Sequence, residues 1–339
     1  MGIEQRKALI EQIEKKRGSK LICCLTSDRI NANGLLAKDF IPIFFQHLRK
    51  FPATERVDTF MFTMGGETLA AFGLSRLLRE FAKHLGVLVP EKCHSGGTLF
   101  CLGADEICMT KIATLSPIDP SITGLMNPMI ELAPGQRQFL PVSVESVAGY
   151  KTLVKDDWKL NEGDTGLAFK MLAERINPLL LGDVYRSREQ ITRLAEKLLH
   201  NHRRDKKQIT HISEQLTKKL GSHDYLISRK EAREIFGRQI LADDEDLEKL
   251  IWELYEDFES EMELGKPYNS PIVLNNAKAQ NTPMPVRVQQ KIVTIESSSG
   301  KDVWERHINI FPLQLPTPGG MMDRIRSEPI QEGWTHSND

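Results

Sequence analysis

The chain has 339 residues, of which 40% are hydrophobic and 27% are charged, as in an ordinary globular protein. Its formal net charge of −1 gives no electrostatic reason to expect a nucleic acid or an anionic membrane as partner. Residues 1–20 are charged and amphipathic, without an apolar run of signal-peptide or membrane-spanning length. We therefore expect no membrane segment, and either one large domain with appendages or two modest domains.

Cysteine usage indicates a reducing compartment. The chain has five cysteines, and all of them lie in apolar stretches: Cys23, Cys24, Cys93, Cys101 and Cys108. Buried thiols of this kind are typical of the cytoplasm, so we expect a cytoplasmic protein. No Cys/His spacing matches a zinc site and no P-loop is present, so we expect no metal and no cofactor.

The first third of the chain alternates between short apolar runs and amphipathic stretches. Continuous apolar runs predict buried strands over residues 20–26, 57–63, 87–89 and 106–109. Apolar residues at helical spacing predict helices over residues 3–17, 37–51 and 67–85. This alternation favours an α/β fold with a mostly parallel sheet and right-handed crossovers. Ligands of such sheets bind at the carboxyl ends of the strands, and Gly65 and Gly66 follow one of these strands.

The stretch with the clearest chemistry follows the next strand. Cys93-His94-Ser95-Gly96-Gly97 is succeeded at once by an apolar segment, 98–104, which we interpret as a strand, a tight turn and a helix. A serine on such a turn is exposed, and the amide groups beside it can hold an oxyanion. The glycines let backbone and substrate approach closely. A helix N-cap serine without any chemical role would give the same local pattern.

The rest of the chain is predicted to be largely helical as far as residue 264. Residues 123–143 are loop-like and would form a lid or a wall over the site. Helices are expected over residues 144–156, 166–177, 178–201, 205–220 and 243–263, and a capping-box pattern at Ser228 to Glu231 opens another. Two β-like runs, 286–295 and 303–311, predict a hairpin, and the last residues are expected to be a tail.

Taken in order, these motifs resemble the ClpP/crotonase fold. The likeness rests on Gly65-Gly66 after one strand, Ser95-Gly96-Gly97 after the next, then Ala104-Asp105-Glu106 and a turn reading Leu115-Ser116-Pro117-Ile118-Asp119-Pro120. Within this fold the sequence is most similar to the branch of signal peptide peptidase A and the serine dehydrogenase proteinases. The Ser222-His223-Asp224-Tyr225 segment looks like the C-terminal portion of that branch. The resemblance covers roughly residues 18–240.

The resemblance implies a serine peptidase that assembles into homo-oligomeric rings and acts on peptides or unfolded protein. The chain then divides into an N-terminal helix (1–19), a ClpP/crotonase-like protease domain (20–240), an acidic helix (241–264) and a C-terminal extension with a β-hairpin and a tail (265–339). The membrane helix usual at the N-terminus of this branch is missing, so we expect a soluble member. The C-terminal extension is where we expect a docking partner.

The resemblance also implies roles for the motif residues. Ser95 would be the nucleophile, and Gly65 and Gly66 would supply an oxyanion hole, with the Gly66 N–H acting together with the Gly96 N–H. Members of the peptidase-A branch use a lysine as general base. Lys151, at the start of the helix after the loop-like segment, lies in a local pattern similar to their lysine-bearing helix. A lysine on the surface of an amphipathic helix would give the same pattern.

Other residues are candidates for the base. Classical ClpP proteases use a histidine downstream of the serine, but this region reads Asp119-Pro120 and has no histidine between His94 and His200. A Ser-His-Asp triad with ClpP spacing is therefore excluded. His94, which adjoins the serine, His223 and Asp119 stay as weaker candidates for the base or the site. Lys92 and Lys111 are weaker still.

Two other functions are consistent with the same fold. One is a crotonase-like enzyme that holds an acyl-CoA enolate on the paired amides, and Ser95 at the turn counts against it. The other is a non-catalytic oligomeric scaffold that has kept the fold and lost the base. Reaction with a serine-directed fluorophosphonate separates the peptidase from both.

Overall fold

The computed structural model describes residues 3–118, 121–122, 124–133, 136–140, 142–202, 205–220, 222, 224–317 and 320–337. Contacts within the chain define two compact units. Unit 1 combines Met1–Leu115 with Ser228–Asp339, and unit 2 is the intervening segment Ser116–Ile227. The division expected from the sequence, with boundaries after residues 19, 240 and 264, is a different one and stays a proposal.

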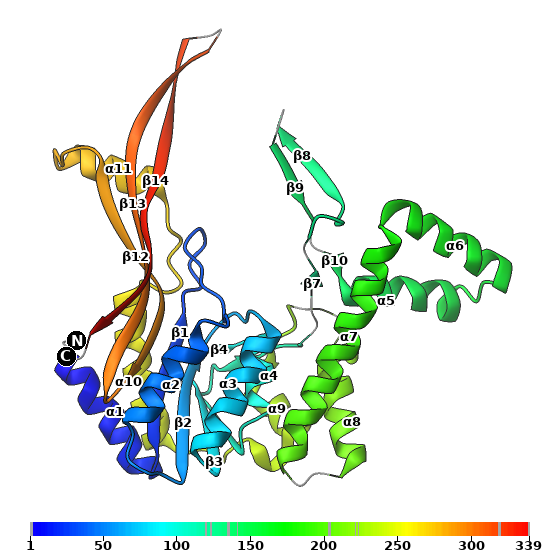
Figure 1. Ribbon diagram of the computed structural model, residues 1–339, viewed down its shortest axis with the longest axis horizontal. Helices are drawn as coiled ribbons and strands as arrows, with labels where there is room; N and C mark the ends of the chain where they lie inside the picture. Colours follow the sequence, from blue (N-terminus) through cyan, green and yellow to red (C-terminus); the bar gives the residue numbers. More distant parts are fainter. Residues whose placement is uncertain are drawn as a thin grey trace. The chain divides into compact units, whose positions relative to one another are not determined.

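Four parallel strands form one side of the unit 1 sheet, with β5 at its edge (Figure 1). In spatial order they are β1 (Lys20–Thr26), β2 (Arg56–Phe62), β3 (His84–Val89) and β5 (Glu106–Met109). The helices between them are α2 (Phe40–Lys50), α3 (Thr68–Phe81) and α4 (Gly96–Cys101). β1 and β2 are buried along almost their whole length, as their continuous apolar runs predict. The α/β class with a parallel-rich sheet is confirmed.

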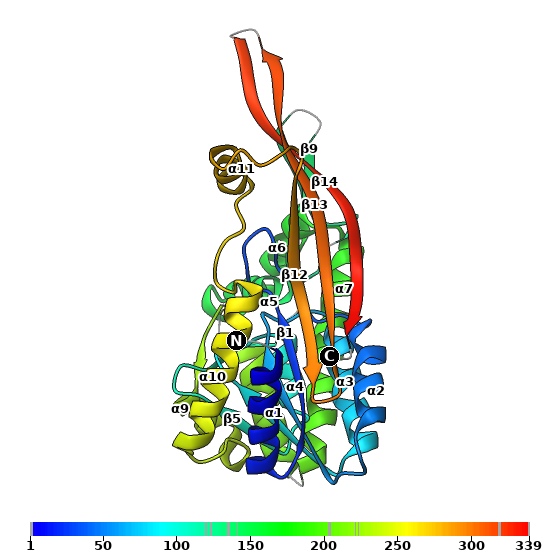
Figure 2. The same cartoon turned by 90° about the vertical axis from the view of Figure 1, so that its left-hand side faces the viewer.

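Helices cover both faces of this sheet. Figure 2 shows α1 (Ile3–Arg17) and α10 (Glu245–Met262) on one side, and α2 and α3 on the other. The core between the sheet and the first pair is made of fully buried apolar side chains, among them Ile10, Ile13, Phe60, Phe62, Ile251, Leu254 and Phe258. The narrow apolar stripe of α1 therefore faces the sheet.

The C-terminal strands continue the same sheet. β12 (Val286–Ser297) pairs antiparallel with β1, and β13 (Gly300–Thr317) and β14 (Gly320–Ser337) follow outward. The predicted hairpin is present as β12 and β13, but it is joined to the parallel sheet. The expectation of a tail is wrong for Gly320–Ser337. Pairing along β13 holds this segment as an edge strand, a position that tolerates its Pro329.

The stretch before these strands holds a helix that the sequence analysis did not assign. α11 (Ser270–Ala279) follows Asn269, whose side chain accepts a hydrogen bond from the Ile272 N–H at 3.1 Å. Pro271 lies in its first turn, where a missing N–H costs nothing. The Pro and Asn that made this stretch look irregular are therefore helix-start signals.

Short elements complete unit 1. β4 (Lys92–Cys93) and β6 (Thr114–Leu115) pair in parallel, and β11 (Ile227–Ser228) lies at the unit boundary. α9 (Arg229–Phe236) precedes the 3-10 turn η4 (Gly237–Gln239). The Ser228 hydroxyl accepts from the Glu231 N–H at 3.3 Å, so the serine of the predicted capping box caps α9.

A buried ion cluster ties α1, α10 and β12 together. Arg6 on α1 is 4% exposed and pairs with Asp257 and Glu261 of α10 and with Glu296 of β12, the last at 2.9 Å. Lys301 of β13 also contacts Glu261, with its Nζ 2.6 Å from Oε1. Because each buried charge has opposite charges around it, the cluster links the N-terminal helix to the C-terminal strands.

Unit 2 is mainly helical. Its longer helices are α5 (Val144–Thr152), α6 (Glu162–Arg175), α7 (Pro178–Leu199) and α8 (Lys206–Glu214). The π-helical turns η1 (Leu153–Asp157) and η3 (Gln215–Lys219) extend α5 and α8, and η2 (His200–His202) follows α7. Residues 123–143, expected to be a loop, contain the antiparallel hairpin of β8 (Met129–Ala133) and β9 (Gln136–Phe139). The small strands β7 (Ser121–Ile122) and β10 (Val142–Ser143) pair antiparallel.

Candidate active site

The end of β2 and the turn after β4 lie side by side. The Thr63 N–H donates to the Lys92 carbonyl at 2.9 Å, and the Thr63 carbonyl accepts from the His94 N–H at 3.0 Å. This bridge places Gly65 against Ser95: a Cβ built on Gly65 would lie 2.7 Å from the Ser95 Cβ. Only glycine leaves room for the serine at this point. The two motifs predicted at neighbouring strand ends are therefore brought together.

Ser95 has the backbone of a strained turn. Its φ is +47° and its ψ is −110°, which non-glycine residues rarely adopt and which is typical of residues held in place at functional sites. It occupies the N-cap position of α4, but its side chain makes no capping hydrogen bond to that helix. The simple N-cap reading of this serine is therefore not supported. Ser95 is also partly exposed, whereas every residue of α4 is buried.

Two backbone N–H groups lie next to this serine. Leu36 holds Gly66 on one side, because the Leu36 N–H donates to the Gly65 carbonyl and the Glu67 N–H donates to the Leu36 carbonyl, both at 2.8 Å. On the other side a Cβ built on Gly96 would lie 3.3 Å from the Gly66 nitrogen. Among the described residues, neither the Gly66 N–H nor the Gly96 N–H has a hydrogen-bond partner. Two unpaired donors beside a hydroxyl can stabilise an oxyanion.

Gly97 sets how closely α4 approaches the strands. A Cβ on this residue would lie 2.6 Å from Thr63 Cγ2 and 2.8 Å from Cys93 Sγ. Thr98, the next residue, donates a hydrogen bond from its hydroxyl to the Cys93 carbonyl at 2.9 Å. The helix therefore starts directly against β2 and β4, and this contact fixes the position of the turn that carries Ser95.

The side chains that flank Ser95 in the sequence are engaged elsewhere. The His94 ring is buried and its Nε2 lies 2.8 Å from the Thr114 hydroxyl on β6. The Lys92 Nζ lies 2.8 Å from Asp28 and 3.2 Å from Glu91. Partial burial acts to lower the pKa of Lys92, but the two carboxylates outweigh it and raise the pKa above its usual value. Lys92 therefore stays protonated and is unsuited to act as a base.

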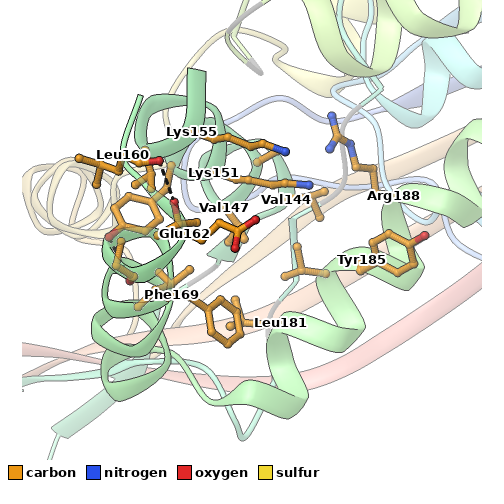
Figure 3. Close-up of a pocket in the computed structure, with 18 residues that line it drawn as sticks. Val144, Val147, Lys151, Lys155, Leu160, Glu162, Phe169, Leu181, Tyr185 and Arg188 are labelled. Carbon is orange, nitrogen blue, oxygen red and sulfur yellow. Dashed lines mark hydrogen bonds between the residues drawn. The ribbon is translucent and has the colours of Figure 1, made fainter. Parts of the chain in front are cut away.

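Lys151 lies in unit 2, and its side chain is exposed. It is in the last turn of α5, so its expected position at the start of the helix is wrong, because the helix begins seven residues earlier, at Val144. It lines a cavity of about 840 Å³ between α5, η1, α6 and α7. Figure 3 shows the amines of Lys151 and Lys155 extending in the same direction, toward the side on which Arg188 lies. The Tyr150 hydroxyl donates to the Ala168 carbonyl at 3.1 Å, which holds α5 against α6. The other walls are mostly apolar, as Val147 and Leu181 illustrate.

The remaining candidates give no support for a metal or for another base. Asp119 and His223 lie outside the described residues. Lys111 is exposed. In the part of the chain that the structure describes, no group of His, Cys, Asp and Glu side chains is placed to hold a metal ion. In the same part, no helix is both long enough and apolar enough to cross a bilayer.

Comparison with known proteins identifies the N-terminal part. Residues 1–139, which include β2, Gly65-Gly66 and the Ser95 turn, match the family model described as ClpP-like SDH-type serine proteinase. The matched segment is less than half of the chain. The resemblance stated from the motifs is thus confirmed there.

Similar proteins are found among curated proteins and solved structures. Two uncharacterized proteins of Methanocaldococcus jannaschii are 32% and 30% identical over 126 and 138 residues, which cover 35% and 39% of this chain. The matches span 43% and 48% of those proteins, less than half of their length. Similar solved structures include a mutant of the 1510-N membrane-bound stomatin-specific protease (TM-score 0.40, 11% identity, 67% of this chain and 82% of that one). ClpP1 from Listeria monocytogenes has a TM-score of 0.36 and 12% identity over 70% of this chain and 97% of that one.

The structure adds residues that the motifs of this proteinase family did not reveal. Leu36 holds Gly66 from a loop far away in the sequence, and Thr114 holds the His94 ring. Three large apolar side chains beside the Gly65-Gly66 and Leu36 segments are 43–50% exposed: Leu35, Met64 and Leu69. In the sequence these are single residues in a loop or at an element end, so no periodicity marked them.

Proposed function

We propose that this protein is a serine peptidase that hydrolyses peptide bonds through an acyl-enzyme on Ser95. The observation that carries the proposal is the partly exposed hydroxyl-bearing residue on a strained turn, next to the N–H groups of Gly66 and Gly96, which have no partner among the described residues. The family of residues 1–139 supports the same reaction class.

The chemistry follows from this arrangement. The Ser95 Oγ attacks the peptide carbonyl carbon and passes its proton to a base, while the carbonyl oxygen becomes an oxyanion held by the two amide donors. When the intermediate collapses, the C–N bond breaks and the base returns the proton to the leaving amine. Water then hydrolyses the ester on Ser95, and the base takes a proton from the water. Leu35, Met64 and Leu69 offer exposed apolar contacts for a substrate beside the glycine pair.

We propose Lys151 as the base of a Ser-Lys dyad. The support is its resemblance to the lysine-bearing helix of the peptidase-A branch and its place on the wall of a largely apolar cavity. The π-helical turn η1, which directly follows α5, is a feature often found near functional sites. Among described cationic neighbours of the motif, Lys92 is held protonated by carboxylates, which favours a base supplied from elsewhere.

Assembly and location are part of the same proposal. Peptide or unfolded-protein substrates, a homo-oligomeric ring, a cytoplasmic location and a docking partner on the C-terminal extension come from the family resemblance and the cysteine usage. α6 exposes Leu167, Phe169 and Met171 by 57–60%, more apolar surface than one helix usually leaves in water. A second copy of the chain would cover these side chains.

A fluorophosphonate probe tests the proposal directly. Intact-mass spectrometry should show a single phosphonyl adduct on the wild type, as Ser95 Oγ displaces fluoride. We expect no adduct on Ser95→Ala and none on Lys151→Ala. Lys155→Ala is the matched control, since Lys155 lines the same cavity one turn later, and it should label like the wild type. Absence of labelling on the assembled wild-type protein would favour the scaffold function, and labelling that survives Lys151→Ala would remove Lys151 from the site.

A further inference from the structure

Besides the cavity of unit 2, unit 1 has a pocket of its own, formed mostly by the C-terminal extension. Its volume is about 420 Å³, within the range of about 300–1,000 Å³ typical of ligand sites. The floor is one face of the sheet, where Gln290 of β12 is directly opposite Arg306 of β13 in the strand register. Tyr268 and the segment after it form a wall, and Asn31 closes the pocket from the loop after β1.

Two polar side chains of this pocket have no hydrogen-bond partner among the described residues. Gln290 is 2% exposed, and neither the oxygen nor the nitrogen of its amide has a hydrogen-bond partner among the described residues. The Tyr268 hydroxyl, on a side chain that is 7% exposed, also has none. Buried polar groups are nearly always hydrogen-bonded, since an unmade bond costs the full desolvation of the group. Gln290 and Tyr268 both line the cavity, so three buried, unpaired atoms belong to side chains in its wall, which points to a ligand that reaches them.

The unpaired atoms define the chemistry of that ligand. A carboxamide offers two N–H donors and a carbonyl acceptor, and a peptide bond presents the complementary carbonyl and N–H. Arg306 is already paired, with its Nε 2.6 Å from Glu332, so no unpaired cation favours an anion here. Ile308 adds apolar surface to the floor. A neutral amide is thus the matching group.

We propose that this pocket is a second peptide-binding site, in which the Gln290 side chain pairs with a main-chain amide of an extended segment and Tyr268 takes a further hydrogen bond. The proposal rests on the proposed peptidase function for the kind of chain that is bound. The pocket is also linked to the candidate active site within unit 1. The Asn31 amide donates to the Tyr268 carbonyl at 3.1 Å, and the same loop continues to Leu36, which holds Gly66. A bound chain would therefore steady the loop that supports the oxyanion hole.

Fluorescence anisotropy with fluorescein-labelled casein, an unstructured chain, tests this site. Every variant is made on Ser95→Ala, so that binding is measured without turnover. Gln290→Leu should weaken binding about tenfold, and Tyr268→Phe about threefold, because each removes hydrogen bonds to the bound amide. Gln289→Leu is the matched control: Gln289 is the neighbouring residue on the opposite, exposed face of β12, and its loss should leave Kd unchanged.

Thermal unfolding shows whether a binding defect is a folding defect. Replacing the unpaired Gln290 amide by leucine should raise the Tm of the free protein, so weaker binding by a more stable variant supports the proposal. Equal Kd values for Gln290→Leu and Gln289→Leu would mean that water alone fills the pocket and would overturn it. Fluorophosphonate labelling of Gln290→Leu with Ser95 intact keeps the two proposals apart. Labelling of the wild type together with Gln290-independent binding rejects only this site, whereas Gln290-dependent binding by a protein whose wild type does not label supports the site and rejects the peptidase.

Discussion

The Ser95 turn and the Lys151 helix are built on opposite principles. Around Ser95 the arrangement is made of backbone: two glycines at positive φ, a strained serine, and contacts so close that a single Cβ would not fit. Lys151 is an exposed side chain near the end of a helix in the other compact unit, on the wall of a cavity. The proposed nucleophile and oxyanion donors are thus positioned by the backbone of one unit, whereas the proposed base is an exposed side chain.

The largest expected effect concerns Lys151, the proposed base. Lys151→Arg keeps the charge and the length but cannot give up its proton, because a guanidinium stays protonated in proteins. If Lys151 is the base, casein hydrolysis should fall by about 10²–10⁴-fold, the usual contribution of a general base. Lys155→Arg should hydrolyse casein at the wild-type rate. Equal rates for both variants would place the base elsewhere, and Asp119 and His223 would be the next residues to replace.

The Gly65-Gly66 segment beside the Ser95 turn is tested by adding a side chain where glycine leaves no room for one. Gly66 has a φ of +145°, and a Cβ there would lie 2.3 Å from the Leu36 carbonyl oxygen. Gly66→Ala should therefore displace the amide donor and reduce turnover by about 10²-fold or more, as loss of one oxyanion donor does elsewhere. Gly149 of α5 is the contrasting control, because a Cβ there meets nothing within 4 Å. Gly149→Ala should keep its activity and gain up to about 1 kcal/mol of stability from helix propensity.

The same contrast explains what the sequence could reveal. The buried strands, the crossover helices and the Ser95 turn were predicted because each depends on local patterns: an apolar run, a helical spacing, a glycine pair. β1 was predicted to the residue, and α1 likewise. Gly65 and Ser95 could be assigned to one site because parallel strands end at the same edge of a sheet.

What was missed depends on partners distant in sequence. β14 looked like a tail because its own residues do not alternate strongly, and pairing with β13 holds it. Leu36 makes backbone hydrogen bonds to the residues on both sides of Gly66, a contact between segments distant in sequence. The Gln290 amide is likewise buried by segments distant in sequence. The helix α11 is a different case, since Asn269 and Pro271 are local helix-start signals that the sequence analysis did not use.

A smaller effect concerns how the stability of the two units depends on pH. Burial acts to raise the pKa of Glu261, but Arg6, Lys291 and Lys301 outweigh it and lower the pKa to about 2 from its usual 4.5. Because the folded-state pKa is the lower one, this carboxylate stabilises unit 1 above about pH 4.5, and the contribution is lost as the pH falls toward 2. With allowance for solvent screening, on the order of 2 kcal/mol should disappear over this window.

Urea unfolding between pH 5 and pH 2.5 measures this loss, with Glu261→Gln as the variant that should lack it. Glu253→Gln is the control, since Glu253 lies on the same helix with its nearest lysine 3.9 Å away. Ion pairs of unit 2 such as that of Arg186 with Asp183 include an exposed side chain, so amide exchange in unit 2 should change less over the same range. A loss of stability in Glu261→Gln as steep as in the wild type would contradict the assignment.

The smallest effect concerns the other nucleophile in the Ser95 segment, Cys93. Its thiol is fully buried, and that burial raises its pKa well above the usual value; burial likewise raises the pKa of Cys108 to about 12. A thiol that stays protonated and has no access to solvent is a poor nucleophile. Ellman's reagent should therefore react with almost none of the five cysteines in the native protein and with all five after unfolding. Pretreatment with the reagent should leave fluorophosphonate labelling unchanged, because the chemistry at this turn belongs to a hydroxyl that the backbone presents and not to the thiol packed beneath Gly97. Rapid modification of Cys93 in the folded protein, with parallel loss of labelling, would show that the turn opens to solvent and is not rigid.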